Sequence, residues 1–312
     1  MSGTQAVTAT PVQVPKQSPA VGSRRSRKLK NDPTGKSPVW VRIVLALTCV
    51  AWVIPTLGLA ITSFRTQDDA TNSGWWTVFT TPANFTRLTF QNYSDVFSKA
   101  NMGAAFINSL AITVPATVIP ILIAAFAAYA FSFMRFPGRD LLLILIVGLL
   151  VVPTQVALVP LLKIFGTLGI NGTFPAIWIA HIGFGMPLAV YIIRNYMATL
   201  PREVIESAKI DGASHFQTFW RLILPMSTPV LASFAIFQFL WVWNDLLNAL
   251  VFIGPNENAP LTIALVSLLG QQGQGWQLLT AGGLFTMLVP ILVFLSLQRY
   301  FVRGMTAGAV KG

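Results

Sequence analysis

The sequence predicts an all-α polytopic membrane protein with six transmembrane helices. Of the 312 residues, 54% are hydrophobic and only 10% are charged, and the mean hydropathy is +0.65. Soluble domains carry about 25% charged residues, so this composition belongs to the membrane class. The apolar runs are continuous and roughly 20 residues long, as transmembrane helices require. They do not alternate as the strands of a membrane barrel would.

Six apolar runs are long enough to cross a bilayer. We expect spans at about residues 39–63, 103–132, 139–163, 174–196, 228–253 and 276–302. Pro153 and Pro160 flank Gln155 in the third run, and we expect them to kink it because proline interrupts helical hydrogen bonding. Residues 1–38 are rich in Pro, Ser, Thr, Lys and Arg without apolar periodicity. This predicts a disordered, basic tail before a transmembrane domain at residues 39–312.

Lys and Arg are distributed unequally between the two sets of connecting segments. With the amino terminus inside, the inside segments hold 17 of these residues, from Lys16 to Lys311. The outside segments hold four, namely Arg65, Arg87, Lys99 and Lys163. This bias predicts that both termini are cytoplasmic. Topology thus accounts for the net charge of +11, and we expect contact with membrane lipid but no nucleic-acid partner.

No motif in the sequence predicts catalysis, nucleotide binding or a metal site. Residues 35–37, "GKS", resemble part of a phosphate-binding loop, but Lys30 stands where that motif needs glycine and Pro38 follows where a helix should start. His181 and His215 have no acidic or cysteine companion at metal-ligand spacing, and we expect His215 at the surface. We therefore expect neither an enzyme nor a cofactor bound by this chain.

A polar stripe is predicted in the fifth span. At about 100° per residue, one arc of roughly 120° holds Gln238, Trp241, Asn244, Asp245 and Asn248. A carboxylate inside a bilayer costs roughly 2.5–3.5 kcal/mol, so the stripe should face a polar cavity or another protein. Two interpretations stay open: contacts between helices, or the lining of a solute path. Carboxamides, a carboxylate and tryptophans suit sugar hydroxyls and ring faces, and Gln155 is a further candidate for such a path.

A charged, amphipathic insert separates the fourth and fifth spans on the inside. We expect two short helices, over residues 201–210 and 215–224. Gly212 suits a left-handed turn at the end of the first helix. Ser214 and Gln217 form a capping-box pattern at the start of the second. The insert is either an interfacial amphipathic element or a docking element for a soluble partner.

The insert, about residues 199–227, resembles the "EAA" loop of permease subunits of bacterial ABC importers. The family pattern of Glu-Ala-Ala, Asp-Gly-Ala and a closing Leu-Pro corresponds to Glu206-Ser207-Ala208, Asp211-Gly212-Ala213 and Leu224-Pro225. Ser207 replaces the second alanine of the pattern with another small residue, and Pro225 is expected to end the second helix. Residues 241–253 and 297–312 are similar to the carbohydrate branch of the maltose-type, MalG-like family, with α-glucoside permeases as a finer subgroup.

This resemblance covers about residues 40–312 and implies the type I (MetI-like) permease fold in a bacterial cell membrane. It implies a second homologous permease, two copies of a cytoplasmic ATPase that holds ATP and Mg, and an extracytoplasmic sugar-binding protein. Glu206 would make a charged contact with the ATPase, and Gly212 would form the turn of the coupling helices. A loop reaching into the binding protein would contain Gln271, Gln272, Gly273 and Gln274.

Two alternatives remain. One is an ABC permease for another class of solute. The other is an ion-coupled secondary transporter, which usually has two related halves in one chain.

Overall fold

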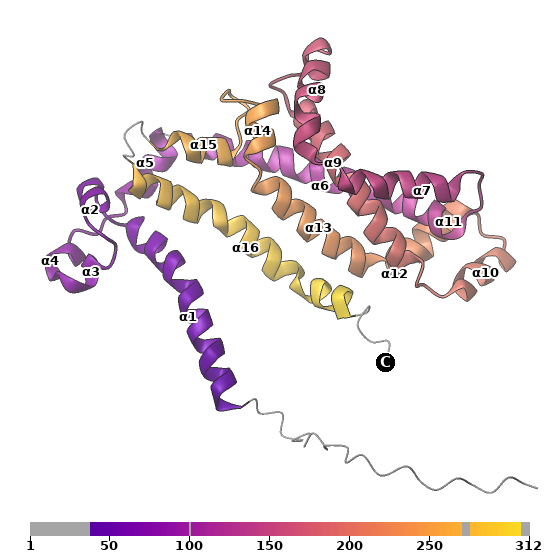
Figure 1. Cartoon of the computed structure of the whole chain (residues 1–312), viewed down its shortest axis with the longest axis horizontal. Coiled ribbons are helices and arrows are strands. Elements are labelled where there is room, and N and C mark those ends of the chain that lie inside the picture. Colours follow the sequence, from indigo (N-terminus) through magenta and orange to yellow (C-terminus); the bar gives the residue numbers. More distant parts are fainter. Residues whose placement is uncertain (1–37, 100, 270–274, 307–312) are drawn as a thin grey trace, which may run out of the picture. The chain divides into compact units, whose positions relative to one another are not determined.

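The computed structural model describes residues 38–99, 101–269 and 275–306, and all regular elements in these ranges are helical (Figure 1). The long helices are α1 (Val39–Thr62), α6 (Met102–Phe133), α9 (Phe174–Met197) and α16 (Trp276–Thr306). All four are long and apolar enough to cross a membrane, α16 over Trp276–Gln298. They correspond to four of the six predicted spans.

The predicted third span is not a continuous helix. It consists of α7 (Arg139–Gly148), a short 3-10 helix η1 (Leu149–Val151) and α8 (Thr154–Thr167), with a bend of 100° between its two parts. Val152 before Pro153 is extended, with ψ of 120°, because a proline ring disfavours the helical conformation in the preceding residue. Pro160 lies inside α8. The prediction of one helix over 139–163 is therefore wrong, and the break lies at Pro153.

The predicted fifth span is also broken. Helix α13 (Thr228–Trp243) ends at Asn244, and the chain becomes helical again in α14 (Leu247–Phe252). Side chains at the break bond to local backbone, which competes with the helical ladder. Asn244 Nδ2 donates to the Leu240 carbonyl at 2.7 Å, and Asp245 Oδ1 accepts from the Asn248 N–H at 3.4 Å. A single helix over 228–253 is therefore wrong. The described residues hold four candidate crossings, or up to six if two bent pairs each count as one span, namely Arg139–Val151 with Thr154–Thr167 and His215–Met226 with Thr228–Trp243.

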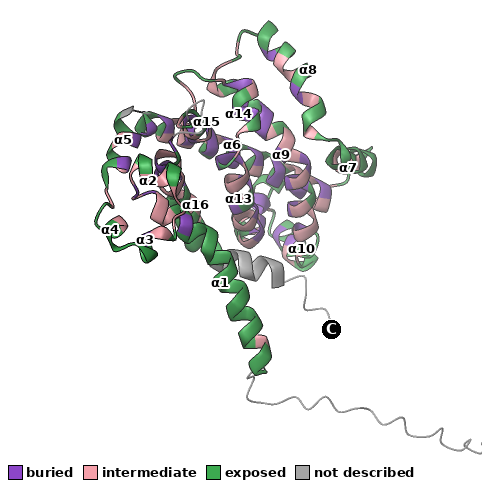
Figure 2. Ribbon diagram, turned by 60° about the vertical axis from the view of Figure 1, so that its left-hand side comes forward, coloured by how far each residue is buried: buried purple, intermediate pink, exposed green. Residues whose placement is uncertain are grey.

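Helices α6, α9 and α13 form the core. The internal contacts of the chain divide it after Val50, and these helices lie in the unit that begins at Ala51. Within this unit α6 packs along α9, and α13 packs on both α6 and α16. Buried residues gather on these helices (Figure 2). Alanines 124, 125 and 128 of α6 and 189 of α9 are fully buried, and such small residues let membrane helices approach closely.

Short helices occupy the segments between the long ones. Their bounds are α2 (Gln67–Asn72), α3 (Thr77–Thr80), α4 (Pro82–Phe85), α5 (Gln91–Lys99) and α15 (Leu261–Ser267). The segment after α1 is organised around Arg65, which is 2% exposed and donates to the Ser73 carbonyl at 2.9 Å. Asn92 Nδ2 donates to the carbonyls of Ser63 and Arg65, each at 2.8 Å. Burial lowers the pKa of the Arg65 guanidinium, and Asp69 partly offsets this.

Candidate functional site

The charged insert folds as a helical hairpin. Its first arm, α10 (Arg202–Ile210), is followed by Gly212 with φ of +75°, a left-handed conformation that glycine adopts without strain. Its second arm starts with α11 (His215–Thr218). The Gln217 N–H donates to Ser214 Oγ at 3.3 Å, and the Ser214 N–H donates to Gln217 Oε1 at 2.9 Å. The predicted turn and capping box are both confirmed.

Pro225 does not end the second arm, contrary to the prediction. The arm continues through a π-helical turn, η2 (Phe219–Ile223), into α12 (Leu224–Met226). A proline ring in an α-helix clashes with the carbonyl four residues earlier, and a π turn widens the backbone just before this position. The second arm therefore reaches Ser227, where it meets α13 at an angle of 71°.

Buried side chains fix both arms to the long helices. Ile205 of α10 and Phe219 and Ile223 of η2 are buried in one cluster with residues of α6, α9 and α13. The Phe219 ring stacks on Phe126 of α6 with centroids 4.4 Å apart. His215 is exposed, as predicted, and its Nδ1 lies 3.0 Å from the Tyr129 hydroxyl of α6. A displacement of the hairpin must therefore be transmitted to the core or break these contacts.

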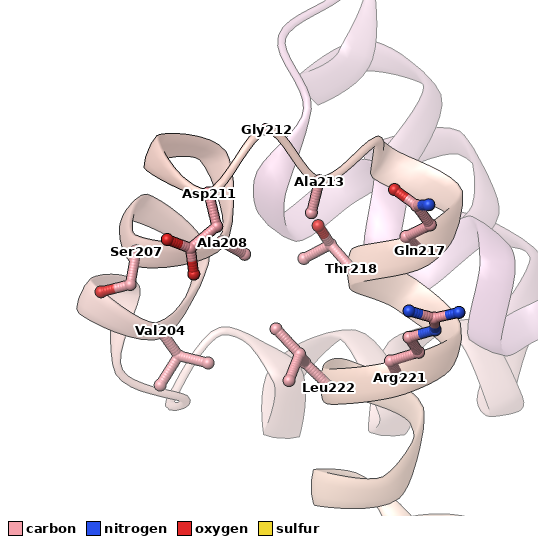
Figure 3. A pocket seen from close by; sticks show the side chains of 10 residues that line it. All are labelled: Val204, Ser207, Ala208, Asp211, Gly212, Ala213, Gln217, Thr218, Arg221 and Leu222. Carbon is pink, nitrogen blue, oxygen red and sulfur yellow. The ribbon is translucent and has the colours of Figure 1, made fainter.

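An open groove of about 710 Å³ lies between the two arms (Figure 3). Figure 3 shows Val204, Ser207 and Asp211 on the first arm, opposite Arg221 and Leu222 on the second. Five predicted coupling residues line this groove, namely Ser207, Ala208, Asp211, Gly212 and Ala213.

The three other predicted coupling residues lie elsewhere. Glu206 lines a separate cavity on another face of α10. Leu224 packs against the buried cluster, and Pro225 is exposed.

A polar cluster lies at the break in the fifth span. His181 of α9 is 0% exposed, and its Nε2 lies 3.4 Å from Asp245 Oδ2. Its ring is edge-on to Trp241, with centroids 5.5 Å apart. Asp245 Oδ1 also accepts from Asn248 Nδ2 at 3.1 Å, and the Asp245 carbonyl accepts from Thr262 Oγ1 at 2.9 Å. The break thus joins residues of α9, α14 and α15.

The predicted polar stripe does not form one helical face, because the helix breaks at Asn244. Gln238 is 1% exposed and its Nε2 donates to the Ala116 carbonyl of α6 at 3.2 Å, which is a contact between helices. Asn248 is buried, whereas Asn244 is exposed, as is Gln155 on the first turn of α8. The lining of a solute path by these residues stays a prediction.

Besides Thr262, sequence reasoning missed His181 as a member of this cluster. It is too distant from Asp245 in the sequence for any spacing rule to pair them. The sequence did contain one signal: His181 lies inside a predicted span. An ionisable side chain there is costly and usually has a polar partner.

The described residues form no metal site, and the predicted binding-protein loop lies outside them. In residues 38–99, 101–269 and 275–306, no three His, Cys, Asp or Glu side chains gather as metal ligands. The predicted loop residues Gln271, Gln272, Gly273 and Gln274 lie outside the described ranges. So do residues 1–37 of the predicted tail and the carboxyl end from residue 307.

A comparison with models of protein families assigns the chain to a family. The model described as "Binding-protein-dependent transport system inner membrane component" matches residues 120–307, which is more than half of the chain. The chain belongs to this family. This permease is therefore an inner-membrane component of a transport system, and its resemblance to permease subunits of ABC importers is confirmed.

Two relatives of the permease match three quarters or more of its length. "Osmoprotective compounds uptake permease protein GgtD" of Synechocystis sp. is 52% identical over 286 residues, which are 90% of this chain and 96% of the relative. "Alpha-glucoside transport system permease protein AglG" of Rhizobium meliloti is 56% identical over 241 residues, which are 75% of this chain and 63% of the relative.

A solved structure shares the fold of the permease. A chain of a bacterial ABC transporter involved in the import of the acidic polysaccharide alginate matches with a TM-score of 0.70. It is 19% identical, and the match covers 84% of this chain and 95% of that chain. The fold is therefore the MetI-like fold of ABC importer permeases.

Proposed function

We propose that this permease is the transmembrane subunit of an ATP-driven ABC importer for a sugar, either an oligosaccharide or an α-glucoside. The observation that carries the proposal is the hairpin of residues 202–226. Its groove is open and exposes most of the family motif, while Ile205, Phe219 and Ile223 anchor its arms to the core helices. Such an element suits docking of a soluble partner whose movement must reach the membrane spans.

The proposed topology has six spans with both termini in the cytoplasm. The four long helices, one crossing by the bent pair α7–α8 and one by α13 without the hairpin arm before it give six, and an even number places both termini on the same side. The positive-inside bias assigns that side to the cytoplasm. The hairpin between α9 and α13 then also faces the cytoplasm, where an ATPase can reach it.

The proposed partners are a second homologous permease, two copies of a cytoplasmic ATPase and an extracytoplasmic sugar-binding protein. The described spans expose many large apolar side chains, which suit lipid or a second membrane subunit. A solved structure with a TM-score of 0.60 and 14% identity is that of a bacterial alginate ABC transporter in complex with an alginate pentasaccharide-bound periplasmic protein. That complex supports an equivalent arrangement here.

The proposed mechanism is mechanical. ATP and Mg bind to the ATPase subunits, and closure of the ATPase dimer moves the two hairpins. Contacts of Phe219 with Phe126 and of His215 with Tyr129 pass this movement to α6, and the short link at Ser227 passes it to α13. The movement of α6 and α13 then opens the solute path alternately to the two sides of the membrane.

The proposed substrate class rests on relatives and on the polar break in the fifth span. Besides AglG, the relative "Arabinooligosaccharides transport system permease protein AraQ" of Halalkalibacterium halodurans is 32% identical over 261 residues. Trp241, Asn244 and Asp245 offer an aromatic face and hydrogen-bonding groups suited to a sugar. These residues are the candidates for contact with the solute as it passes.

Reconstitution of the complete importer in liposomes tests the proposal. Uptake of α-linked disaccharides should require the binding protein and ATP, and should continue when ion gradients are collapsed. Uptake that follows an ion gradient without ATP would overturn the importer proposal. ATP-driven uptake of solutes other than sugars would overturn only the substrate class.

A further inference from the structure

A second cavity, of about 460 Å³, lies beside α10 and separate from the groove of the hairpin. The last turn of α6 and the loop that leads to α7 form one wall, and α10 forms the other. Its charged lining consists of Arg135, Arg139, Arg202, Lys209 and Glu206. Four cationic side chains and one anionic side chain therefore surround this cavity.

Few carboxylates of the described chain neutralise the charges of these four cations. In the part of the chain that the structure describes, Arg139 pairs with Asp140 at 2.9 Å, whereas Arg135, Arg202 and Lys209 form no ion pair. Glu206 is the only carboxylate in the lining and makes no ion pair there either. Like charges around a common cavity repel one another, and an anion in the cavity would relieve this repulsion.

The cavity lies where a membrane span ends. Its lining includes Ser132, Phe133 and Met134, and the candidate span Met102–Phe133 ends among them. The next apolar helix, α7, starts at Arg139, which lines the same cavity. Because both helices pass from apolar to charged residues here, the cavity lies at the depth of lipid headgroups. Basic pockets between transmembrane helices at this depth bind acidic headgroups.

We propose that this cavity binds the phosphate headgroup of an anionic phospholipid. The guanidinium groups of Arg135 and Arg202 suit bidentate contact with phosphate oxygens, and Lys209 supplies a point charge. His215, held 3.0 Å from the Tyr129 hydroxyl, lines the same cavity and adds a polar contact. The proposal requires only that the chain spans a membrane and does not depend on the substrate or on the ATPase.

The lipid and the hairpin groove would use different faces of α10. The cavity takes Arg202, Ile205, Glu206 and Lys209 from this helix, and the groove takes Val204, Ser207, Ala208 and Asp211. The groove therefore stays open when the cavity is occupied. A bound headgroup would support α10 from the membrane side and hold the first arm in position.

Lipid binding to the purified importer complex, measured by native mass spectrometry, tests the proposal. Phosphatidylglycerol is the probe and phosphatidylcholine the comparison lipid. Arg135→Gln, Arg202→Gln and Lys209→Gln should each weaken phosphatidylglycerol binding about fivefold, since each charge contributes roughly 1 kcal/mol at a membrane surface. Lys163→Gln, an exposed lysine on α8, is the matched control and should bind as the unmodified protein does.

Glu206→Gln is a second variant, in which the expected change is a gain and not a loss. It removes the one negative charge of the cavity lining and should strengthen phosphatidylglycerol binding. A gain in binding at an unchanged melting temperature separates this effect from loss of fold. Inorganic phosphate is the second probe; displacement of the lipid by soluble phosphate alone would assign the cavity to a free anion. Unchanged lipid binding in all three cation variants overturns the proposal.

Discussion

His181 Nε2 lies 3.4 Å from Asp245 Oδ2, at the place where the fifth span of this permease is interrupted. Neither atom has a hydrogen-bond partner of good geometry, although both are buried. A buried polar atom without a partner costs about 1–3 kcal/mol. The contact is therefore incomplete in this conformation, and a small shift of α9 relative to the break would complete it or separate the two groups.

The pair should show energetic coupling. His181→Leu should lower the stability of the detergent-purified importer by about 1–3 kcal/mol, because it replaces the polar group beside the buried Asp245 Oδ2 with an apolar one. With Asp245→Asn added, the loss should be smaller than the sum of the two single losses. Thermal unfolding of the two single variants and the double variant completes the cycle. Strictly additive losses would show that the two residues act independently.

Asn244 separates the two interpretations of the polar residues in the fifth span. It is exposed, and its side chain donates to the Leu240 carbonyl within its own helix. Asn244→Ala should therefore change the free energy of unfolding by no more than about 0.5 kcal/mol, and the melting temperature should stay nearly the same. If the residue contacts the sugar, uptake should fall severalfold at subsaturating sugar. Gln238→Ala, which removes a buried contact between helices, should instead lower stability. Normal uptake by the Asn244 variant would exclude it from the solute path.

Gly212 should be sensitive to backbone conformation alone. A Cβ at this position would meet no atom within 4 Å, so any effect of substitution arises from φ of +75°. Gly212→Val should cost roughly 1–2 kcal/mol or more, because a β-branched residue resists this conformation. Binding of the ATPase to the purified permease should then weaken about 5–30-fold. Gly212→Asn, which tolerates the left-handed region, should retain most of the affinity; equal effects would argue against the conformational cause.

Two glycines of α9 provide a matched pair. A Cβ on Gly185 would lie 2.7 Å from Gln238 Nε2, whereas a Cβ on Gly183 would meet nothing within 4 Å. Gly185→Ala should displace Gln238 from the Ala116 carbonyl and lower stability by about 1–3 kcal/mol. Gly183→Ala should be neutral or slightly stabilising, since alanine favours helix. Melting temperatures of the two variants measure the difference. Similar values would show that the close approach of Gly185 to Gln238 does not contribute to stability.

The capping box at the hairpin should control how firmly the second arm is held. Ser214→Ala removes the acceptor for the Gln217 N–H and should cost about 1 kcal/mol of local stability. Trypsin should then cleave after Arg221 about fivefold faster under native conditions, because cleavage follows local opening. Ser98→Ala, which changes an exposed serine outside any cap, should not alter this rate. An unchanged rate for Ser214→Ala would mean that core contacts alone hold the arm.

Features that depend on local chemistry could be predicted from the sequence. Helices α1, α6, α9 and α16 follow from continuous apolar composition, which decides between water and lipid without knowledge of neighbours. The turn at Gly212 and the cap at Ser214 involve residues a few positions apart. Such short-range patterns retain their meaning in any surrounding structure.

Features that depend on distant residues could not be predicted. The projection of residues 237–253 on one helix assumed an unbroken backbone, but Asn244 and Asp245 end the helix, and Thr262 and His181 contact Asp245 at the break. Proline rules alone placed a helix end at Pro225, whereas a π turn carries the helix past it. The two faces of α10 likewise became distinct only once the end of α6 was located beside one of them.

The division of α10 into two faces constrains the length of this part of the chain. Successive residues of an α-helix are rotated by about 100°, so one inserted residue between Pro201 and Glu206 would turn Glu206 and Lys209 away from the basic cavity. Substitutions change the affinity of one face at a time, whereas an insertion or deletion rotates both faces together by about 100° per residue. The segment from Pro201 to Gly212 should therefore tolerate changes of side chain far better than a change in the number of its residues.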